Sequence, residues 1–146
     1  MKQILMIALI AIATGTSAFA STTTETNSVK VMDHFNASYK DVKNVAWTFN
    51  GTYERASFTL GQQKLEVYYN TDGDLIGTTK NFNFDKLPQA AIETITTKYT
   101  FPKYELRDCV EFVNAYDEKC YYVSFTKKKQ TIVVKIDQKG EVSRVS

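Results

Sequence analysis

Alternating apolar and polar residues mark two β-hairpins in the chain. In the first, a two-residue loop at Gly61-Gln62 places Phe58 opposite Leu65, so apolar side chains share one face. In the second, a loop at Lys128-Lys129 pairs the apolar residues of its strands in the same way. The pattern therefore predicts two antiparallel hairpins, each with one face toward a core.

Two other segments carry the helical period instead. The first runs from about Ser28, a good N-cap, to Tyr39. The second is expected to start near the N-cap candidate Asp85, with Pro88 in the permissive first turn, and to end at Tyr99. Because each helical segment precedes a set of strands, we expect an α+β fold with helices on one face of a mostly antiparallel sheet.

The order of helix, strands and glycine turn occurs twice along the chain. A shift of 67 residues aligns Phe58 with Phe125 and holds through the following strand and turn. A register maintained over that length indicates duplication. The sequence thus predicts two tandem helix-plus-antiparallel-strand repeats, about residues 29–80 and 85–146, that form one sheet with two helices packed on one face.

The start of the chain has the pattern of a secretory signal peptide. An apolar run follows Lys2, and Ala18-Phe19-Ala20 matches the small-x-small cleavage pattern. The run is shorter than the roughly 20 apolar residues that span a bilayer, although a membrane anchor is the alternative. We expect a periplasmic or secreted protein without a membrane span, composed of a signal peptide (residues 1–20), a flexible leader (21–28) and a single domain (29–146).

The charge balance argues against nucleic acid as a partner. The formal net charge of the whole chain is +2, whereas phosphate binding needs a concentrated basic surface. The basic run Lys127-Lys128-Lys129 falls in a predicted turn. A solvated turn is favoured there over a phosphate or membrane contact.

The sequence shows no catalytic constellation. The single histidine, His34, lies beside the apolar stripe of the first helix, and no Ser or Cys lies in a nucleophile motif. Residues 70–74 resemble a calcium loop only superficially, because the closing glutamate is missing, and a turn explains them better. We therefore expect no enzymatic activity, no metal and no cofactor.

Cys109 and Cys120 are expected on the two arms of a third hairpin. A tight turn near Asn114-Ala115 would place them directly opposite each other, facing away from the helices. An exported protein can oxidise such a pair, so the sequence predicts a structural disulfide. Two free thiols or a metal pair are the alternatives.

The sheet face opposite the helices is the candidate binding surface. Alternation and the expected registers place Tyr122 opposite both Arg107 and Lys135. Ordinary cross-strand pairing on a solvated sheet is one interpretation. A recognition surface is the other interpretation, because tyrosine and arginine are enriched at interface hot spots. The candidate partner-binding residues are Tyr53, Arg55, Tyr68, Arg107, Tyr122 and Lys135.

Several short motifs resemble the PepSY-like, β-lactamase-inhibitor-like periplasmic domains. They are Leu87-Pro88-Gln89-Ala90 before the second helix, a tyrosine at the end of each helix, Val45-Ala46-Trp47, and the turn Asp72-Gly73-Asp74-Leu75. The resemblance covers about Val29 to Ser146. It implies tandem α-β repeats after a signal peptide and a non-enzymatic, protein-binding role. The β-lactamase inhibitor protein grips its target with the sheet face away from its helices.

The predicted function is therefore an exported, non-enzymatic module that binds a protein or peptide of the cell envelope. Inhibition of a β-lactamase or a peptidase rests on the resemblance alone. The alternative is a small-ligand or lipid carrier, which needs a cavity between helices and sheet. The many core aromatics argue against such a cavity because they fill space.

Overall fold

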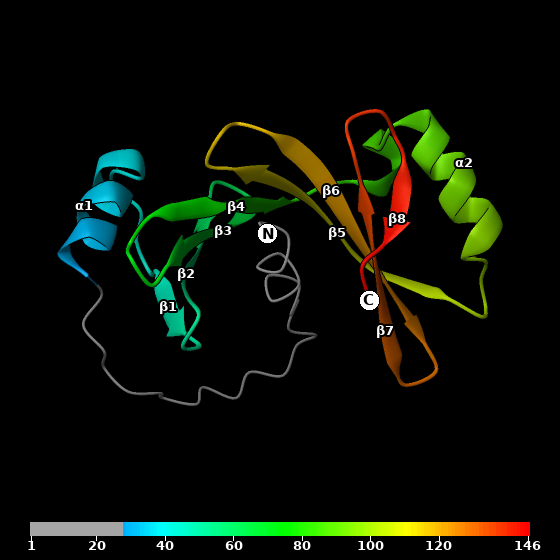
Figure 1. Ribbon diagram of the computed structural model, residues 1–146, viewed down its shortest axis with the longest axis horizontal. Coiled ribbons are helices and arrows are strands. Elements are labelled where there is room, and N and C mark those ends of the chain that lie inside the picture. Colours follow the sequence, from blue (N-terminus) through cyan, green and yellow to red (C-terminus); the bar gives the residue numbers. More distant parts are fainter. Residues whose placement is uncertain (1–27) are drawn as a thin grey trace. The chain divides into compact units, whose positions relative to one another are not determined.

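The computed structural model describes residues 28–146, which form one antiparallel sheet and two α-helices (Figure 1). The eight strands are neighbours in sequence order, from β1 to β8. The predicted signal peptide and all of the predicted leader except Ser28 lie outside the described residues. The elements are α1 Val29–Ser38, β1 Ala46–Phe49, β2 Tyr53–Leu60, β3 Gln63–Asn70, β4 Leu75–Asn81, the 3₁₀ helix η2 Phe84–Lys86, α2 Gln89–Lys98, β5 Glu105–Asn114, β6 Lys119–Lys127, β7 Gln130–Ile136 and β8 Val142–Arg144.

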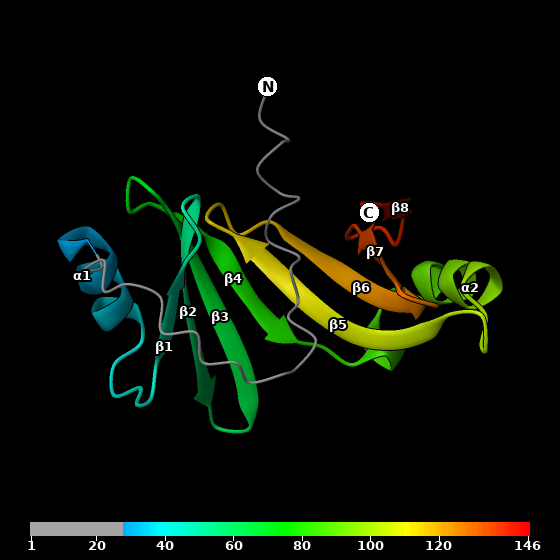
Figure 2. The same ribbon diagram turned by 90° about the horizontal axis from the view of Figure 1, so that it is seen from below.

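The described residues fall into two compact units. The α1 unit comprises residues 28–81 and 112–118, so it contains α1, the strands β1 to β4 and the tip of the β5–β6 hairpin. Its first four strands lie side by side (Figure 2). The α2 unit comprises residues 82–111 and 119–146, which contain α2 and the rest of β5 to β8.

The α+β class is confirmed, but the predicted organisation as two tandem repeats is wrong. All eight strands belong to one sheet in sequence order. The two compact units also cut across the predicted copies, because residues 112–118 belong to the α1 unit. The physical reason lies in the backbone: the amide of Ala115 donates to the carbonyl of Ile76 at 3.2 Å, which ties the hairpin tip to β4.

The two helix starts differ in how well the sequence predicted them. Ser28 caps α1 as expected, since its hydroxyl accepts from the amide of Val31 at 3.2 Å. The start of α2 near Asp85 is wrong: Asp85 lies in η2, and α2 begins at Gln89 after Pro88. Leu87 is extended, with ψ of 159°. A residue before proline is biased away from the α region, so the helix cannot begin earlier.

The registers predicted for the first two hairpins are confirmed. Phe58 pairs with Leu65 across β2 and β3, and Phe125 pairs with Ile132 across β6 and β7. The first residue of each two-residue loop has a positive φ, 64° at Gly61 and 56° at Lys128. This is the left-handed conformation that tight hairpins require.

Each helix covers the apolar sheet face of its own unit, as the alternation predicted. In the α1 unit, Val31 and Phe35 pack on strand residues of β2 and β3. In the α2 unit, Leu87, Ala91 and Ile95 pack on β6 and β7. The buried strand residues of the two cores are Ala56, Phe58, Val67 and Tyr69 in the first, and Val123, Phe125, Val134 and Ile136 in the second.

The β5–β6 hairpin does not turn at Asn114-Ala115 as expected. The amide of Asn114 donates to the carbonyl of Glu118 at 3.0 Å, which leaves a three-residue loop. The side-chain oxygen of Asn114 accepts from the amides of Tyr116 and Glu118, and Asp117 takes the left-handed φ of 61°. The loop closing β3–β4 at Asn70 is built in the same way, with Gly73 at the left-handed position.

The longer loop changes which residues face each other, so the predicted disulfide is not present. Cys109 packs against the α2 core. On β6, Val123 and Phe125 face the α2 core, whereas Cys120 lies on the opposite face. There it hydrogen-bonds with Tyr122. Both cysteines are free thiols. A change of register by an odd number of residues moves side chains to the opposite face, which is why the predicted pairing fails.

Candidate functional site

In the α1 unit, the sheet face away from α1 carries Tyr53, Arg55 and Tyr68 as predicted. Arg55 pairs with Tyr68 across β2 and β3. The rings of Tyr53 and Tyr68 meet edge to face, with centroids 5.5 Å apart. Both residues are buried, Tyr53 at 8% and Tyr68 at 2% exposure. The tyrosine rings are therefore a packed floor of this face, less open than simple alternation suggests.

Close packing at β4 accounts for part of this burial. Gly77 lies opposite Tyr68 across β3 and β4. A Cβ atom at Gly77 would lie 2.6 Å from the ring of Phe112 and 2.5 Å from the carbonyl oxygen of Val113. The hairpin tip thus reaches β4 beside Tyr68 only because residue 77 has no side chain.

Glu66 is the polar centre of this half of the face. The hydroxyl of Tyr68 donates to one carboxylate oxygen at 2.6 Å, and the hydroxyl of Ser57 donates to the other at 3.3 Å. Lys64 Nζ lies 3.3 Å from that second oxygen. Burial disfavours the charged carboxylate, but the Tyr68 hydrogen bond and the cations Arg55 and Lys64 outweigh it and lower the pKa of Glu66.

Arg55 is held in place from two sides. Its Nε donates to the hydroxyl of Thr48 on β1 at 3.1 Å, and a terminal nitrogen lies 3.8 Å from Glu66. The second distance is longer than a hydrogen bond, so the ion pair is loose. The guanidinium is oriented by Thr48 and keeps donor capacity for a further acceptor.

In the α2 unit, Tyr122 and Lys135 occupy the corresponding face. They are cross-strand partners on β6 and β7, as predicted. Tyr122 is buried at 4% exposure, and its hydroxyl donates to the sulfur of Cys120. Burial raises the pKa of the Cys120 thiol, against the opposing effects of Lys135 and Tyr122, so this half is held by a neutral thiol.

Arg107, expected opposite Tyr122, contacts Thr126 instead. Its Nε donates to the hydroxyl of Thr126 at 2.8 Å. The amide of Asp108 donates to the hydroxyl of Ser124 at 3.2 Å, so β5 is displaced along β6 relative to the expected register. A terminal nitrogen of Arg107 lies 3.6 Å from Glu105, and its side chain is 47% exposed. The three-residue loop at the hairpin tip explains the displacement.

Sequence reasoning missed two groups that organise these surfaces. Glu66 and Cys120 are the hydrogen-bond acceptors of Tyr68 and Tyr122. Glu66 lies two residues before Tyr68, and side chains at that spacing along a strand share a face, which was a usable signal. The role of Cys120 depends on the register of the β5–β6 hairpin, which the sequence misassigned.

Other candidate chemistry resolves into structural contacts. His34 Nδ1 lies 3.0 Å from the hydroxyl of Tyr69. Within residues 28–146, no cluster of three or more His, Cys, Asp or Glu side chains is arranged to hold a metal ion. Under α1, the ring of Phe35 lies 5.1 Å from Trp47 and 5.4 Å from Phe58, centroid to centroid. These rings pack together in the core under α1, and an open cavity of about 420 Å³ beside them is lined by Phe35, Tyr39 and Trp47 among other residues.

Comparisons with known proteins identify the fold. No family model matches the chain, and no curated protein matches it. A Bacteroides eggerthii structure, described as an assumed periplasmic protein, has 15% sequence identity and a TM-score of 0.68, over 80% of this chain and 86% of that chain. A DUF2874 family protein from Bacteroides ovatus has 14% identity and a TM-score of 0.66, over 83% and 89%.

A further solved structure carries the name that bears on the predicted resemblance. A BLIP-like protein from Bacteroides fragilis has 14% identity and a TM-score of 0.61, over 80% of this chain and 83% of that chain. The chain therefore has a BLIP-like fold. The predicted periplasmic or secreted location agrees with the description of the Bacteroides eggerthii neighbour. None of the helices in the described part of the chain is long and apolar enough to cross a bilayer.

Proposed function

We propose that the chain is an exported, non-enzymatic binding module that holds a protein or peptide partner against the sheet face away from its helices. The observation that carries the proposal is the presentation of arginine. In each unit an arginine is oriented by an Nε hydrogen bond to a threonine hydroxyl: Arg55, on this face, to Thr48, and Arg107 on β5 to Thr126. Their ion pairs with neighbouring glutamates are 3.8 and 3.6 Å long.

A guanidinium fixed in this way loses little further freedom when it binds. Its planar fork can then donate hydrogen bonds to a carboxylate or a backbone carbonyl of a partner. In the α1 unit, the buried rings of Tyr53 and Tyr68 pack beside Arg55. In the α2 unit, Lys135 adds a cation opposite the buried Tyr122. The BLIP-like fold supports a role in protein binding. If the captured partner is an enzyme, an activity assay with and without this chain tests whether binding inhibits it.

Export is part of the same proposal. Cleavage after Ala20 would leave a product that begins at Ser21 and retains every described residue. N-terminal sequencing of the protein recovered from the periplasm or medium tests this. A product that still begins at Met1 would contradict it.

The binding test compares two variants that each lose two cations. The chain from Ser21 is immobilised and exposed to an envelope extract, beside Arg55→Ala/Arg107→Ala and the control Lys40→Ala/Lys86→Ala. We expect a specific partner to be retained by the parent and the control and to bind the arginine variant at least tenfold more weakly when purified. Equal affinity of all three proteins would contradict the assigned face.

A further inference from the structure

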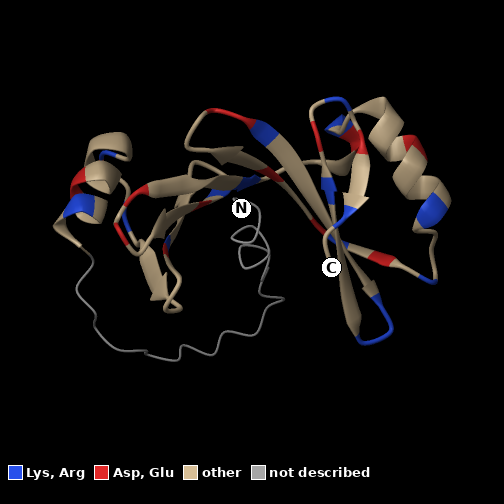
Figure 3. Cartoon of the chain, in the orientation of Figure 1, with Lys and Arg blue, Asp and Glu red and all other residues tan. Residues whose placement is uncertain are grey.

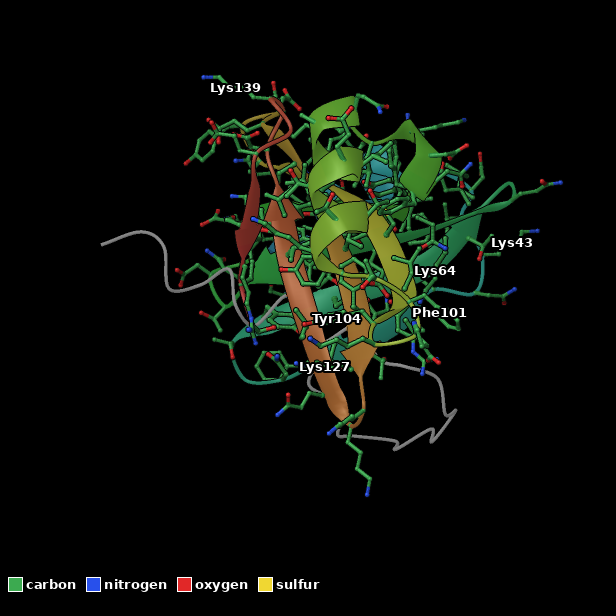
Figure 4. The ribbon with its side chains drawn as sticks, turned by 90° about the vertical axis from the view of Figure 1, so that its right-hand side faces the viewer. Lys43, Lys64, Phe101, Tyr104, Lys127 and Lys139 are labelled. Carbon is green, nitrogen blue, oxygen red and sulfur yellow. The ribbon has the colours of Figure 1, made fainter. Side chains whose placement is uncertain are left out.

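A cluster of lysines surrounds one tyrosine at an end of the α2 unit. The ring of Tyr104, in the turn after α2, lies 5.5 Å from Lys103 Nζ and 5.3 Å from Lys127 Nζ. The same ring meets Tyr99 edge to face at 5.2 Å. Tyr104 thereby joins the turn after α2 to the end of β6, and Figure 4 shows Tyr104 and Lys127 together, far from Lys139.

Three further lysines extend this cluster. Lys128 and Lys129 form the loop of the β6–β7 hairpin, and Lys98 closes α2. Within the described residues, none of the five lysines forms an ion pair. The nearest carboxylate along the chain, Glu105, pairs with Arg107. Figure 3 shows basic colour at the hairpin tip, at the end of α2 and in the turn.

An aromatic side chain projects beside these lysines. Phe101 is 78% exposed, in a turn closed by the hydrogen bond from the amide of Tyr104 to the carbonyl of Thr100 at 3.0 Å. The lysine–aromatic patch is therefore Lys98, Phe101, Lys103, Tyr104, Lys127, Lys128 and Lys129. Because the whole chain has a net charge of only +2, this concentration of cations is local.

We propose that the lysine–aromatic patch docks on the surface of a bilayer that contains anionic phospholipid. Lysines that form no ion pair are attracted to a layer of lipid phosphates, and an exposed aromatic ring is accommodated among the headgroups. An acidic protein would also attract the lysines, but it would need a matching pocket to cover Phe101. A lipid surface satisfies both features without one, so the observations favour it.

The test is co-sedimentation of the chain from Ser21 with phosphatidylcholine vesicles, with or without phosphatidylglycerol, at low and high salt. Residues 1–20 are omitted because their apolar run would itself bind lipid. The patch variant is Lys127→Gln/Lys128→Gln/Lys129→Gln. The control variant, Lys40→Gln/Lys43→Gln/Lys139→Gln, loses the same charge outside the patch. Circular dichroism verifies that all proteins are folded.

We expect binding to the anionic vesicles that weakens with salt and is absent on phosphatidylcholine alone. The patch variant should bind about 100-fold more weakly, at about fivefold for each lysine, whereas the control variant keeps most of the affinity. Phe101→Ser should weaken binding about tenfold. No binding by the parent, or equal binding by the two triple variants, would overturn the proposal. Binding to poly-glutamate but not to anionic vesicles would also overturn it, and would assign the patch to an acidic polymer.

Discussion

Tyr68 and Tyr122 lie on the sheet face away from the helix in their own units, and both are buried, yet different groups hold their hydroxyls. Tyr68 donates to Glu66, a carboxylate surrounded by other donors. Tyr122 donates to Cys120, a thiol that burial keeps neutral. The comparison teaches that a buried tyrosine hydroxyl on this kind of sheet face can be held by a charged or by a neutral acceptor.

The largest effect should come from the glycine opposite Tyr68. We expect Gly77→Ala to destabilise the protein by about 3 kcal/mol, because the new methyl would overlap backbone and ring atoms of the hairpin tip. Urea unfolding monitored by circular dichroism measures the change. A loss below about 1 kcal/mol would mean that the tip can retreat from β4 at little cost.

A matched glycine separates overlap from backbone strain. Gly61 has no atom within 4 Å of a built Cβ, but its φ is 64°. Gly61→Ala should therefore cost only about 1 kcal/mol, from the left-handed backbone alone. If the two glycine variants were equally destabilised, crowding beside Tyr68 would not be the cause.

The next effect tests the two hydroxyls directly. Tyr68→Phe should cost about 2 kcal/mol, because it removes a hydrogen bond to a charged acceptor. Tyr122→Phe should cost about 0.5 kcal/mol, because sulfur is a weak acceptor. Both variants keep the ring, so cavity formation does not enter. Equal costs would remove the distinction between a charged and a neutral anchor.

What the sequence predicted well is local and alternating. The two-residue loops at Gly61 and Lys128 fix their registers within a few residues, so Phe58 and Leu65 could be paired from the pattern alone. The cap at Ser28 is equally local. Helix faces and strand faces in each unit followed from these signals.

What the sequence misassigned depends on one loop and on long-range packing. The choice between a two- and a three-residue turn at Asn114 rests on side-chain hydrogen bonds to Tyr116 and Glu118. That choice moved Cys120 away from Cys109 and Arg107 away from Tyr122. The burial of the tyrosine floor depends on contacts such as Phe112 beside Gly77, which no local pattern contains. The candidate face was thus predicted in composition but not in its geometry.

A smaller effect should appear in acid. The folded state lowers the pKa of Glu66, so its contribution to stability is present above the unfolded value of about 4.3 and is lost as pH falls through the folded value. Glu66→Gln should therefore be about 1 kcal/mol less stable than the parent at pH 7, and this difference should shrink below about pH 4. Unfolding midpoints across that range measure it.

The thiol half supplies the control for this titration. Burial raises the pKa of Cys120, so the thiol stays protonated throughout the acid range. Cys120→Ser should keep the acid dependence of the parent, whatever its stability at neutral pH. A Cys120→Ser variant that lost this dependence would place the titrating group outside the Glu66 network.

The smallest change in stability should belong to the residue best placed to meet a partner. Arg107 is 47% exposed and its ion-pair partner Glu105 is 56% exposed, whereas Arg55 and Glu66 are 20% and 18% exposed. Arg107→Ala should therefore cost about 0.3 kcal/mol and Arg55→Ala about 1 kcal/mol. Urea unfolding of the two variants measures both. If Arg107→Ala lowered the free energy of unfolding more than Arg55→Ala, Arg107 would be the structural arginine and Arg55 the dispensable one, contrary to this assignment. With the expected order, loss of partner binding in Arg107→Ala reports a lost contact, because the fold beneath it is unchanged.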